Sequence, residues 1–194
     1  MARYLALARH LWRSPVSDAV VAMVQPQRGE RVVDLGAGMG AATFIAAETG
    51  AEVMAVDPTP FMRAMLQLRR RAHPRAHVTV LEGAAEAMPF DPQSIDALWT
   101  VNTVHHWTDL PGAIRELRRV LRPGGRLVLV DEDMEDPTHP FHDRMKKQNA
   151  HRHHFAEVDP QAVGALLKQA GFLEVEARLA LVGGRPSKVM TARG

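Results

Sequence analysis

Five apolar stretches alternate with amphipathic segments along the first 130 residues, and two more apolar stretches follow near the end of the sequence. Strands that are buried on both faces of a parallel sheet read as nearly continuous apolar runs. The expected strands are residues 31–34, 51–56, 77–81, 94–101, 126–130, 172–182 and 188–192. Strands that alternate with helices form a doubly wound sheet, and a glycine pair between the last two strands predicts a hairpin. We therefore predict an α/β protein with a doubly wound, seven-stranded sheet, mostly parallel, with a C-terminal antiparallel hairpin.

Three glycines follow the first expected strand, in the stretch RVVDLGAGMG that spans residues 31–40. Gly36, Gly38 and Gly40 allow the left-handed backbone of a tight strand-to-helix turn and let a ligand approach the main chain. The spacing also fits the glycine pattern of dinucleotide-binding folds. Asp34 decides between the two interpretations, because a carboxylate beside the turn repels a pyrophosphate and attracts a cationic ammonium or sulfonium group.

The stretch VVDLGAGMG matches the first motif of the class I S-adenosylmethionine-dependent methyltransferases at every position, and the chain resembles this family in its small-molecule, type 11 form. Further motifs of the family follow in order: an acid after the second strand, the loop EGAAEAMPF, and RVLRPGGRL before the fifth strand. The resemblance covers about residues 28–132. It implies a Rossmann-like fold, S-adenosyl-L-methionine as the cofactor, and methyl transfer. The residues that it places around the cofactor are Asp34, Gly36, Ala37, Gly38, Asp57, Pro58, Met62, Ala84, Ala85 and Asn102.

Three of these positions carry more specific expectations. Asp57 lies 21 residues after Gly36, the distance at which a β-α-β unit places an acid beside a ribose, so its carboxylate is expected to accept both ribose hydroxyls. Ala84 stands where the family commonly has an aspartate that binds the adenine amino group. We therefore expect the backbone at Ala84 and Ala85 to hold the adenine, with a modest cofactor affinity. Met62 either touches the adenine or packs in the core.

The fourth expected strand ends in NTVHHW, residues 102–107. Strand ends at the carboxyl edge of a parallel sheet line the ligand crevice, so we expect this segment at the point of methyl transfer. Histidine suits the role of a base when the acceptor is a phenol or a hydroxyl. His106 and His105 are the candidates, with a packing role as the alternative. Trp12 and Trp107 are candidates for the wall of an aromatic acceptor pocket, with half-buried core positions as the alternative.

A polar segment, residues 131–159, differs in kind from the rest and contains a group of histidines. We predict it as an insertion near the acceptor site. The histidines that we expect to face the substrate are His139, His142, His151 and His154. Two alternatives stay open: the segment is a solvated or partner-facing helix, or pairs of these imidazoles bind a metal ion, since neighbours at helical spacing share a face. We assign no metal site.

The whole chain, residues 1–194, is expected to form a single methyltransferase domain, because its length and its 46% hydrophobic content are those of an ordinary globular protein. Residues 1–26 are predicted as an N-terminal helical lid, in which Ser14 caps a helix with Pro15 in its first turn. The sequence has no cysteine, which excludes disulfides, thiolate metal ligands and a cysteine nucleophile.

Two further features limit the possible partners and the compartment. No apolar run reaches the ~20 residues that span a bilayer, so we predict a cytoplasmic protein without a membrane partner. The net charge of +2 gives little support for a nucleic-acid partner. A homodimer that completes the pocket stays open.

The predicted function is transfer of a methyl group from S-adenosylmethionine to a small-molecule acceptor by in-line displacement, in which the protein supplies alignment and a dry pocket. One alternative is a non-catalytic module that binds the cofactor or a partner. The alanine at position 84 favours this alternative, because it replaces the family's common aspartate. A second is a nicotinamide (NAD)-dependent oxidoreductase. Asp34 argues against it, and the single tyrosine, Tyr4, offers no evident Tyr-Lys pair for hydride transfer.

Overall fold

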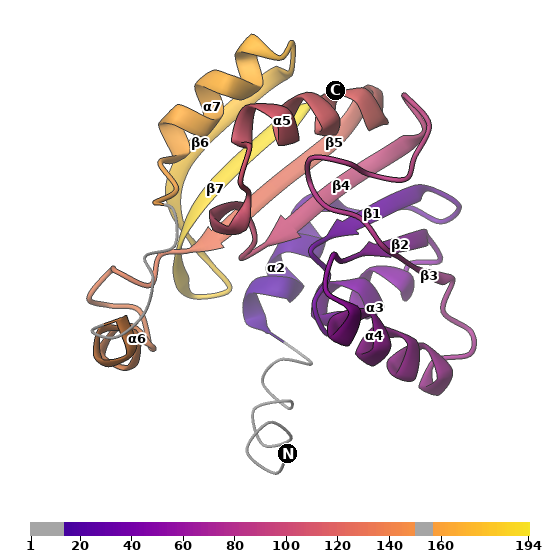
Figure 1. The fold of residues 1–194 in the computed structure, drawn as a ribbon, viewed down its shortest axis with the longest axis horizontal. Helices are drawn as coiled ribbons and strands as arrows, with labels where there is room; N and C mark the ends of the chain where they lie inside the picture. The colour runs from indigo at the N-terminus through magenta and orange to yellow at the C-terminus, as the bar shows by residue number, and fades with distance from the viewer. Residues whose placement is uncertain (1–13, 150–156) are drawn as a thin grey trace.

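The computed structural model describes residues 14–149 and 157–194 (Figure 1). Its centre is a seven-stranded sheet in the order β3-β2-β1-β4-β5-β7-β6. The strands are β1 (Arg31–Leu35), β2 (Glu52–Val56), β3 (Val78–Leu81), β4 (Ile95–Val101), β5 (Leu121–Glu132), β6 (Leu173–Val182) and β7 (Arg185–Arg193). The helices are α2 (Pro15–Val24), α3 (Ala41–Ala47), α4 (Pro60–Ala72), α5 (Leu110–Val120), α6 (His142–Asn149) and α7 (Pro160–Gln169), with a short 3-10 helix, η1 (Val104–His106).

Strands β1 to β5 run parallel, and β7 pairs antiparallel with both β5 and β6. This arrangement confirms the predicted doubly wound sheet and its antiparallel hairpin. The chain moves outward from β1 to β3 and then returns to β4 on the other side of β1, so the strand order reverses between β1 and β4. Ligands of open α/β sheets bind at such a reversal, beyond the carboxyl ends of the strands.

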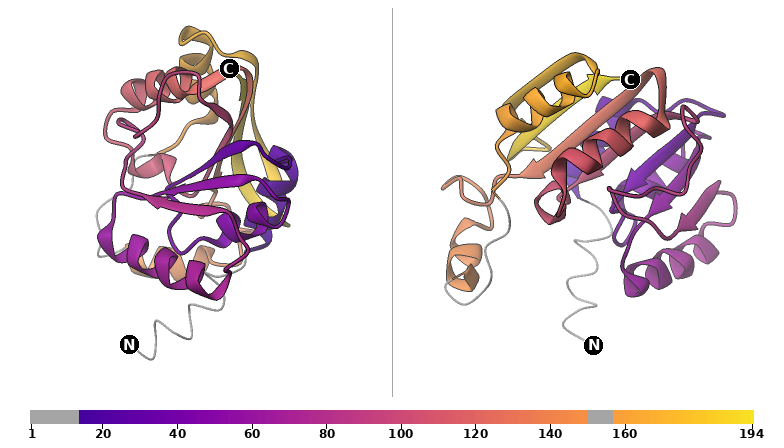
Figure 2. Two further views of the ribbon diagram at one scale, coloured as in Figure 1. Left: turned by 90° about the vertical axis from the view of Figure 1, so that its right-hand side faces the viewer. Right: turned by 45° about the horizontal axis from the view of Figure 1, so that its top comes forward.

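Helices cover both faces of the sheet (Figure 2). Helices α2, α3 and α4 contribute to one apolar cluster, and α5 and α7 contribute to another on the opposite face. Successive side chains of a strand point to opposite faces. In β1, Val32 therefore joins the first cluster, whereas Val33 and Leu35 join the second. Burial on both faces explains why the parallel strands read as continuous apolar runs.

Helix α2 begins at Pro15, beside its N-cap Ser14, whose hydroxyl accepts a hydrogen bond from the first-turn amide of Val16 at 3.2 Å. Valines on one side of the helix are buried against the sheet and α3: Val16, Val20, Val21 and Val24. The helix that the sequence places within residues 1–26 is thus part of the packed core, with its first turn at the cavity described below. The remainder of the predicted lid, residues 1–13, lies outside the described residues.

The RPGG segment, residues 122–125, is an irregular stretch inside β5 rather than a turn that precedes the strand. Strand β5 already begins at Leu121, and its pairing with β4 shifts register before it resumes at Arg126. Gly124 supplies left-handed backbone there, with φ of 75°.

The polar segment after β5 lies beyond the carboxyl end of that strand, near the connection between β6 and β7 (Figure 1). It contains helix α6, and residues 150–156 lie outside the described residues. No helix in the described parts of the chain has the length and apolarity that a membrane span needs.

Candidate active site

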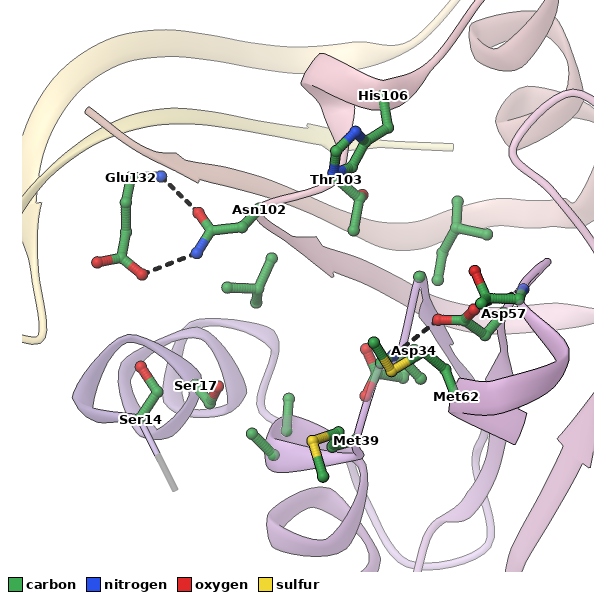
Figure 3. Close-up of a pocket in the computed structure, with 18 of the residues that line it drawn as sticks. Ser14, Ser17, Asp34, Met39, Asp57, Met62, Asn102, Thr103, His106 and Glu132 are labelled. Carbon is green, nitrogen blue, oxygen red and sulfur yellow. Dashed lines mark hydrogen bonds between the residues drawn. The ribbon is translucent and has the colours of Figure 1, made fainter. Parts of the chain in front are cut away.

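A cavity of about 800 Å³ opens at the carboxyl ends of the strands, where the strand order reverses (Figure 3). Its volume lies in the upper part of the range of small-molecule sites. All the residues expected around the cofactor line it, together with two of the acceptor candidates: Asp34, Gly36, Ala37, Gly38, Asp57, Pro58, Met62, Ala84, Ala85, Asn102, His106 and Trp107. The fold therefore brings residues that are separated in sequence to one place.

The glycine turn after β1 is held by the end of β2. The amides of Gly36 and Ala37 donate to the carbonyl of Val56 at 2.8 and 3.0 Å. The amide of Gly38 donates to the carboxylate of Asp57 at 2.9 Å. These amides are engaged within the protein, whereas a phosphate cradle offers its amides to the ligand. The turn therefore favours a ligand without a pyrophosphate.

Asp57 is fixed in position by two backbone amides. It is 5% exposed, and besides the bond from Gly38 its second carboxylate oxygen accepts the amide of Thr59 at 2.8 Å. A carboxylate oxygen can accept more than one hydrogen bond, so both oxygens retain capacity for ligand hydroxyls. Because the side chain is already ordered, binding a ligand here loses little side-chain entropy.

Asp34 lies at the base of the cavity and is 3% exposed. The hydroxyl of Thr43 donates to its carboxylate at 2.6 Å. Burial raises the pKa of Asp34 to about 7, although hydrogen bonds from Thr43 oppose the rise. A cationic group in the cavity would favour the ionised form of this carboxyl.

The loop after β3 is closed by two hydrogen bonds between Ala84 and Ala87, at 3.2 and 3.1 Å. The amide of Ala84 is therefore engaged within the loop and is not offered to the cavity. Of the two residues expected beside an adenine ring, Ala85 is the one that these two bonds do not involve. Glu86 also lines the cavity and accepts the amide of Thr108 at 2.9 Å. That bond holds the loop after β3 against the segment that follows β4.

Asn102 joins the carboxyl ends of β4 and β5 at the cavity wall (Figure 3). Its φ of 57° is uncommon for a residue with a side chain. Its side-chain amide donates to the carboxylate of Glu132 at 2.8 Å, and its side-chain oxygen accepts the amide of Glu132 at 2.7 Å. Glu132 also accepts a hydrogen bond from Arg185 at 2.8 Å. Burial opposes the ionisation of Glu132, but hydrogen bonds from Arg185, Asn102 and His139 outweigh it and hold the pKa of the carboxyl below its usual value.

The two histidines after β4 are placed differently. His105 turns toward the buried Asp131, whose carboxylate lies 2.8 Å from its Nδ1 and also accepts the amides of Thr103 and His105, at 2.9 and 3.1 Å. This side chain lies behind the cavity wall, and its contacts fix the loop. His106 lines the cavity above Thr103 (Figure 3), with its ring centroid 4.1 Å from that of His105.

Burial and the neighbouring His105 hold the pKa of His106 below its usual value, with Asp131 opposing the shift. Its imidazole is therefore mostly neutral at pH 7. A neutral imidazole beside the cavity can accept a proton from a bound molecule.

Two of the histidines expected to face the substrate lie among the described residues, and both stand behind the cavity wall. His139 is 3% exposed, with its Nε2 3.0 Å from the carboxylate of Glu132. The Nδ1 of His142 lies 3.3 Å from the carbonyl of Met134. Both rings thus have polar partners within the segment itself, and neither lines the cavity. The other candidates of the acceptor site lie outside the described residues: Trp12, His151 and His154.

Metal binding is one of the two alternatives that the sequence leaves open for the polar segment. In residues 14–149 and 157–194, no three histidine, aspartate or glutamate side chains are placed to hold a metal ion together.

Several cavity-lining residues are not among the individual site residues expected from the sequence, although most of them lie in the two segments expected near the site, residues 1–26 and 131–159. They come from the start of α2, from the end of β5 and the segment after it, and from the start of β7: Ser14, Ser17, Glu132, Met134, Phe141, Arg144 and Arg185. The rule that ligands bind beyond the carboxyl ends of parallel strands could have suggested Glu132. For the other residues the sequence indicates at most the segment, because only the folded chain brings particular side chains of α2, α6 and β7 to one cavity.

Residues 33–129, which are half of the chain, match the family described as "Methyltransferase domain". The chain belongs to this family. The expected class, the class I S-adenosylmethionine-dependent methyltransferases, is thereby confirmed, and with it the cofactor that this class uses.

Curated relatives match somewhat more than half of the chain. An uncharacterized methyltransferase of Mycobacterium tuberculosis (strain H37Rv) is 48% identical over 105 residues, which are 54% of this chain and 41% of that protein. The ubiquinone/menaquinone biosynthesis C-methyltransferase UbiE of Rubrivivax gelatinosus is 36% identical over 111 residues, which are 57% of this chain and 43% of that protein. The chain thus spans less than half the length of these relatives.

Solved structures resemble the fold over most of the chain. A S-adenosylmethionine-dependent methyltransferase from Aquifex aeolicus has a TM-score of 0.72 and 21% identity, and covers 96% of this chain and 92% of its own. Phosphoethanolamine N-methyltransferase 2 of Haemonchus contortus, solved with S-adenosyl-L-methionine, has a TM-score of 0.73 and 17% identity, with coverage of 91% and 51%. At these identities the likeness concerns the fold.

Proposed function

We propose that this chain binds S-adenosyl-L-methionine in the described cavity and catalyses transfer of its methyl group to a small-molecule acceptor. The observation that carries the proposal is the ordered carboxylate of Asp57, which is bonded to the amides of Gly38 and Thr59 at the edge of the cavity. A carboxylate held beside a glycine turn suits the two hydroxyls of a ribose. Family membership supports the same cofactor.

The residues of the cavity fit the other parts of the cofactor. Met62 and Ala85 line the cavity and offer an apolar contact and an amide to the adenine. Asp34, at the base, suits the cationic ammonium group of the methionine part. Ser14 and Ser17 reach the same cavity from α2 and offer polar groups to the methionine part (Figure 3).

When bound, the cofactor supplies an electrophilic methyl group on a sulfonium that becomes a neutral thioether. The residues of this chain bind, orient and shield the reactants, which is the main requirement of an in-line displacement. His106 accepts the proton that an acceptor hydroxyl loses, and passes it to solvent. His105 and Asp131 position His106 by fixing the loop after β4. Trp107 contributes an apolar wall.

The acceptor is proposed to be a small molecule because the reacting end of the site lies inside a cavity of about 800 Å³, which has the size of a small-molecule site. Two proteins similar to this chain have names that refer to small molecules: the ubiquinone/menaquinone biosynthesis C-methyltransferase of R. gelatinosus and the phosphoethanolamine N-methyltransferase 2 of H. contortus. The low net charge of +2 is consistent with this class of acceptor.

Calorimetric titration of the protein with S-adenosylhomocysteine, with NADH in a parallel cell, tests the proposal. Saturable micromolar binding of S-adenosylhomocysteine and no heat from NADH is the expected result. The reverse pattern would make the chain a nicotinamide-binding protein and would end the proposal.

A non-catalytic cofactor-binding module is the second candidate, favoured by one observation: Ala84 has no side chain for the adenine, and its amide is used by Ala87. This candidate predicts binding of S-adenosylhomocysteine without methyl transfer to any acceptor. The measurement of methyl transfer to the four catechol probes in the next subsection distinguishes this candidate from the enzyme.

A further inference from the structure

The charged groups that line the cavity differ between its two ends. Beside β1, β2 and the loop after β3 the lining charges are the carboxylates of Asp34, Asp57 and Glu86. Around α6 and the start of β7, two guanidinium groups, Arg144 and Arg185, accompany a single carboxylate, Glu132. The far end therefore carries an excess positive charge, whereas the end proposed for the cationic cofactor is acidic.

One of the two arginines is already neutralised. Arg185 donates to the carboxylate of Glu132 at 2.8 Å, and the two side chains are 19% and 3% exposed. Its guanidinium also lies 5.2 Å from the ring centroid of Phe141, another lining residue. Arg185 and Glu132 thus form a compensated pair within the cavity wall.

Arg144 is the charge that remains at the end of the cavity around α6 and the start of β7. It lies in the first turn of α6 and is exposed, and no ion-pair partner is found for it among the described residues. A guanidinium stays protonated at any physiological pH, and its planar fork matches the two oxygens of a carboxylate or a phosphate. His106 adds no positive charge nearby at neutral pH.

We propose that the methyl acceptor carries an anionic oxyacid group, a carboxylate or a phosphate, that Arg144 binds at the far end of the cavity. This inference rests on the proposed methyl transfer and names the acceptor class of the same site. The acceptor is then held at two points, with its anion at Arg144 and its reacting atom beside His106. Two-point binding supplies the alignment that an in-line displacement requires.

The test uses four probes with one catechol body: 3,4-dihydroxybenzoate and its neutral amide, and 3,4-dihydroxybenzyl phosphate and its neutral alcohol. Calorimetry measures their binding to the complex of the protein with S-adenosylhomocysteine, and methyl transfer from labelled S-adenosylmethionine is measured in parallel. We expect one anionic probe to bind at least about 10-fold more tightly than its neutral twin. Comparison of the two pairs identifies the carboxylate or the phosphate as the preferred group.

Arg144→Gln should abolish this preference, and Arg144→Lys should retain part of it because the charge remains. Lys146→Gln, which removes a positive charge from the same helix away from the lining of the cavity, is the matched control and should keep the preference. All three variants should bind S-adenosylhomocysteine as the wild type does. Equal binding of anionic and neutral twins, no binding of any probe, or an unchanged preference in Arg144→Gln would each overturn the inference.

Two other results are distinguishable from these. Weaker S-adenosylhomocysteine binding in Arg144→Gln would assign the arginine to the cofactor's own carboxylate, and it too would overturn the inference. If the wild type itself did not bind S-adenosylhomocysteine, this result would count against the proposed function instead. The preference for the anionic probes would then be measured on the free protein, by the same criterion.

Discussion

The carboxylate of Asp57 and the amide of Gly38 are joined by a hydrogen bond of 2.9 Å, which ties the end of β2 to the glycine turn after β1. The acid that we assign to the ribose is therefore also a structural part of the turn. Substitution at this position is expected to affect the binding of the cofactor and the order of the turn together.

Asp57→Ala should weaken S-adenosylhomocysteine binding by about 1 to 3 kcal/mol, the scale of losing charge-assisted hydrogen bonds. Asp57→Asn keeps the size of the side chain and one acceptor oxygen, so its loss should be smaller. Glu52→Ala, at the exposed start of the same strand, is the control and should bind as the wild type does. Calorimetry gives all four affinities, and equal values for Asp57→Ala and wild type would remove the ribose assignment.

Gly36 makes a steric prediction for the same turn. Its φ is 68°, and a Cβ at this position would overlap the methyl group of Thr103. Gly36→Ala should therefore lower the free energy of unfolding by about 2 to 4 kcal/mol, from backbone strain and overpacking together. Thr103→Ser removes that methyl group and keeps the hydroxyl.

The double variant Gly36→Ala/Thr103→Ser should recover the overpacking part of the loss, but not the backbone strain. Denaturant unfolding of the four proteins gives the coupling energy between the two positions. A coupling energy of zero would show that the turn rearranges to avoid Thr103.

The sequence predicts much of this site because its glycine turn, its acids and its strand ends follow a regular alternation of strands and helices. Asp34, Asp57 and Asn102 could be placed from their positions at the ends of expected strands alone. His105 and His106 could not be told apart, because adjacent residues in a loop can point either way. Only the buried carboxylate of Asp131 shows which ring turns inward.

The side-chain contacts at the far end of the cavity, around α6 and the start of β7, could not be predicted in this way. Glu132 and Arg185 meet because β7 runs antiparallel along β5, and His139 reaches Glu132 from the segment that follows β5. Side-chain pairs of this kind depend on tertiary register, which no local pattern encodes. The RPGG segment shows the same effect on the backbone, since its irregular stretch is set by pairing with β4.

Asp34 makes a prediction about pH. Burial raises its pKa from 3.8 to about 7, so the folded protein retains a proton that the unfolded chain loses at lower pH. The stabilisation that results is fully present below about pH 4 and is lost as the pH rises through about 7. Asp34→Asn mimics the protonated form at every pH. The stability of wild type relative to this variant should fall by about 4 kcal/mol between pH 4 and pH 8.

Denaturant unfolding of both proteins without ligand, at steps of pH, measures this difference. Addition of S-adenosylmethionine should counter the loss, because its cationic groups favour the ionised carboxylate. Its affinity for the wild type should accordingly rise with pH through about 7, while the affinity of Asp34→Asn stays flat. A constant difference in stability between the two proteins would show that Asp34 titrates at its ordinary pKa.

His106 gives the prediction closest to the chemistry. With an acceptor that must lose a proton, His106→Ala should lower turnover by about 100-fold or more, the usual contribution of a general base. Binding of S-adenosylhomocysteine should stay near the wild-type value, because the assigned cofactor contacts come from other residues. Only the neutral ring of His106 accepts a proton, and its pKa is lowered. The wild-type rate, measured with saturating cofactor, should therefore not change as the pH falls until the pH is below about 6.5.

His105→Ala separates chemistry from positioning in the same assay. This change leaves the carboxylate of Asp131 bonded to backbone amides but removes the ring that stacks on His106. Turnover should fall less than in His106→Ala. The neighbouring His105 lowers the pKa of His106, so its removal should raise that pKa. The decline of the rate on acidification should then begin at a higher pH. Equal turnover in His106→Ala and wild type, with an acceptor hydroxyl, would retire His106 as the base and leave alignment alone as the contribution of the protein.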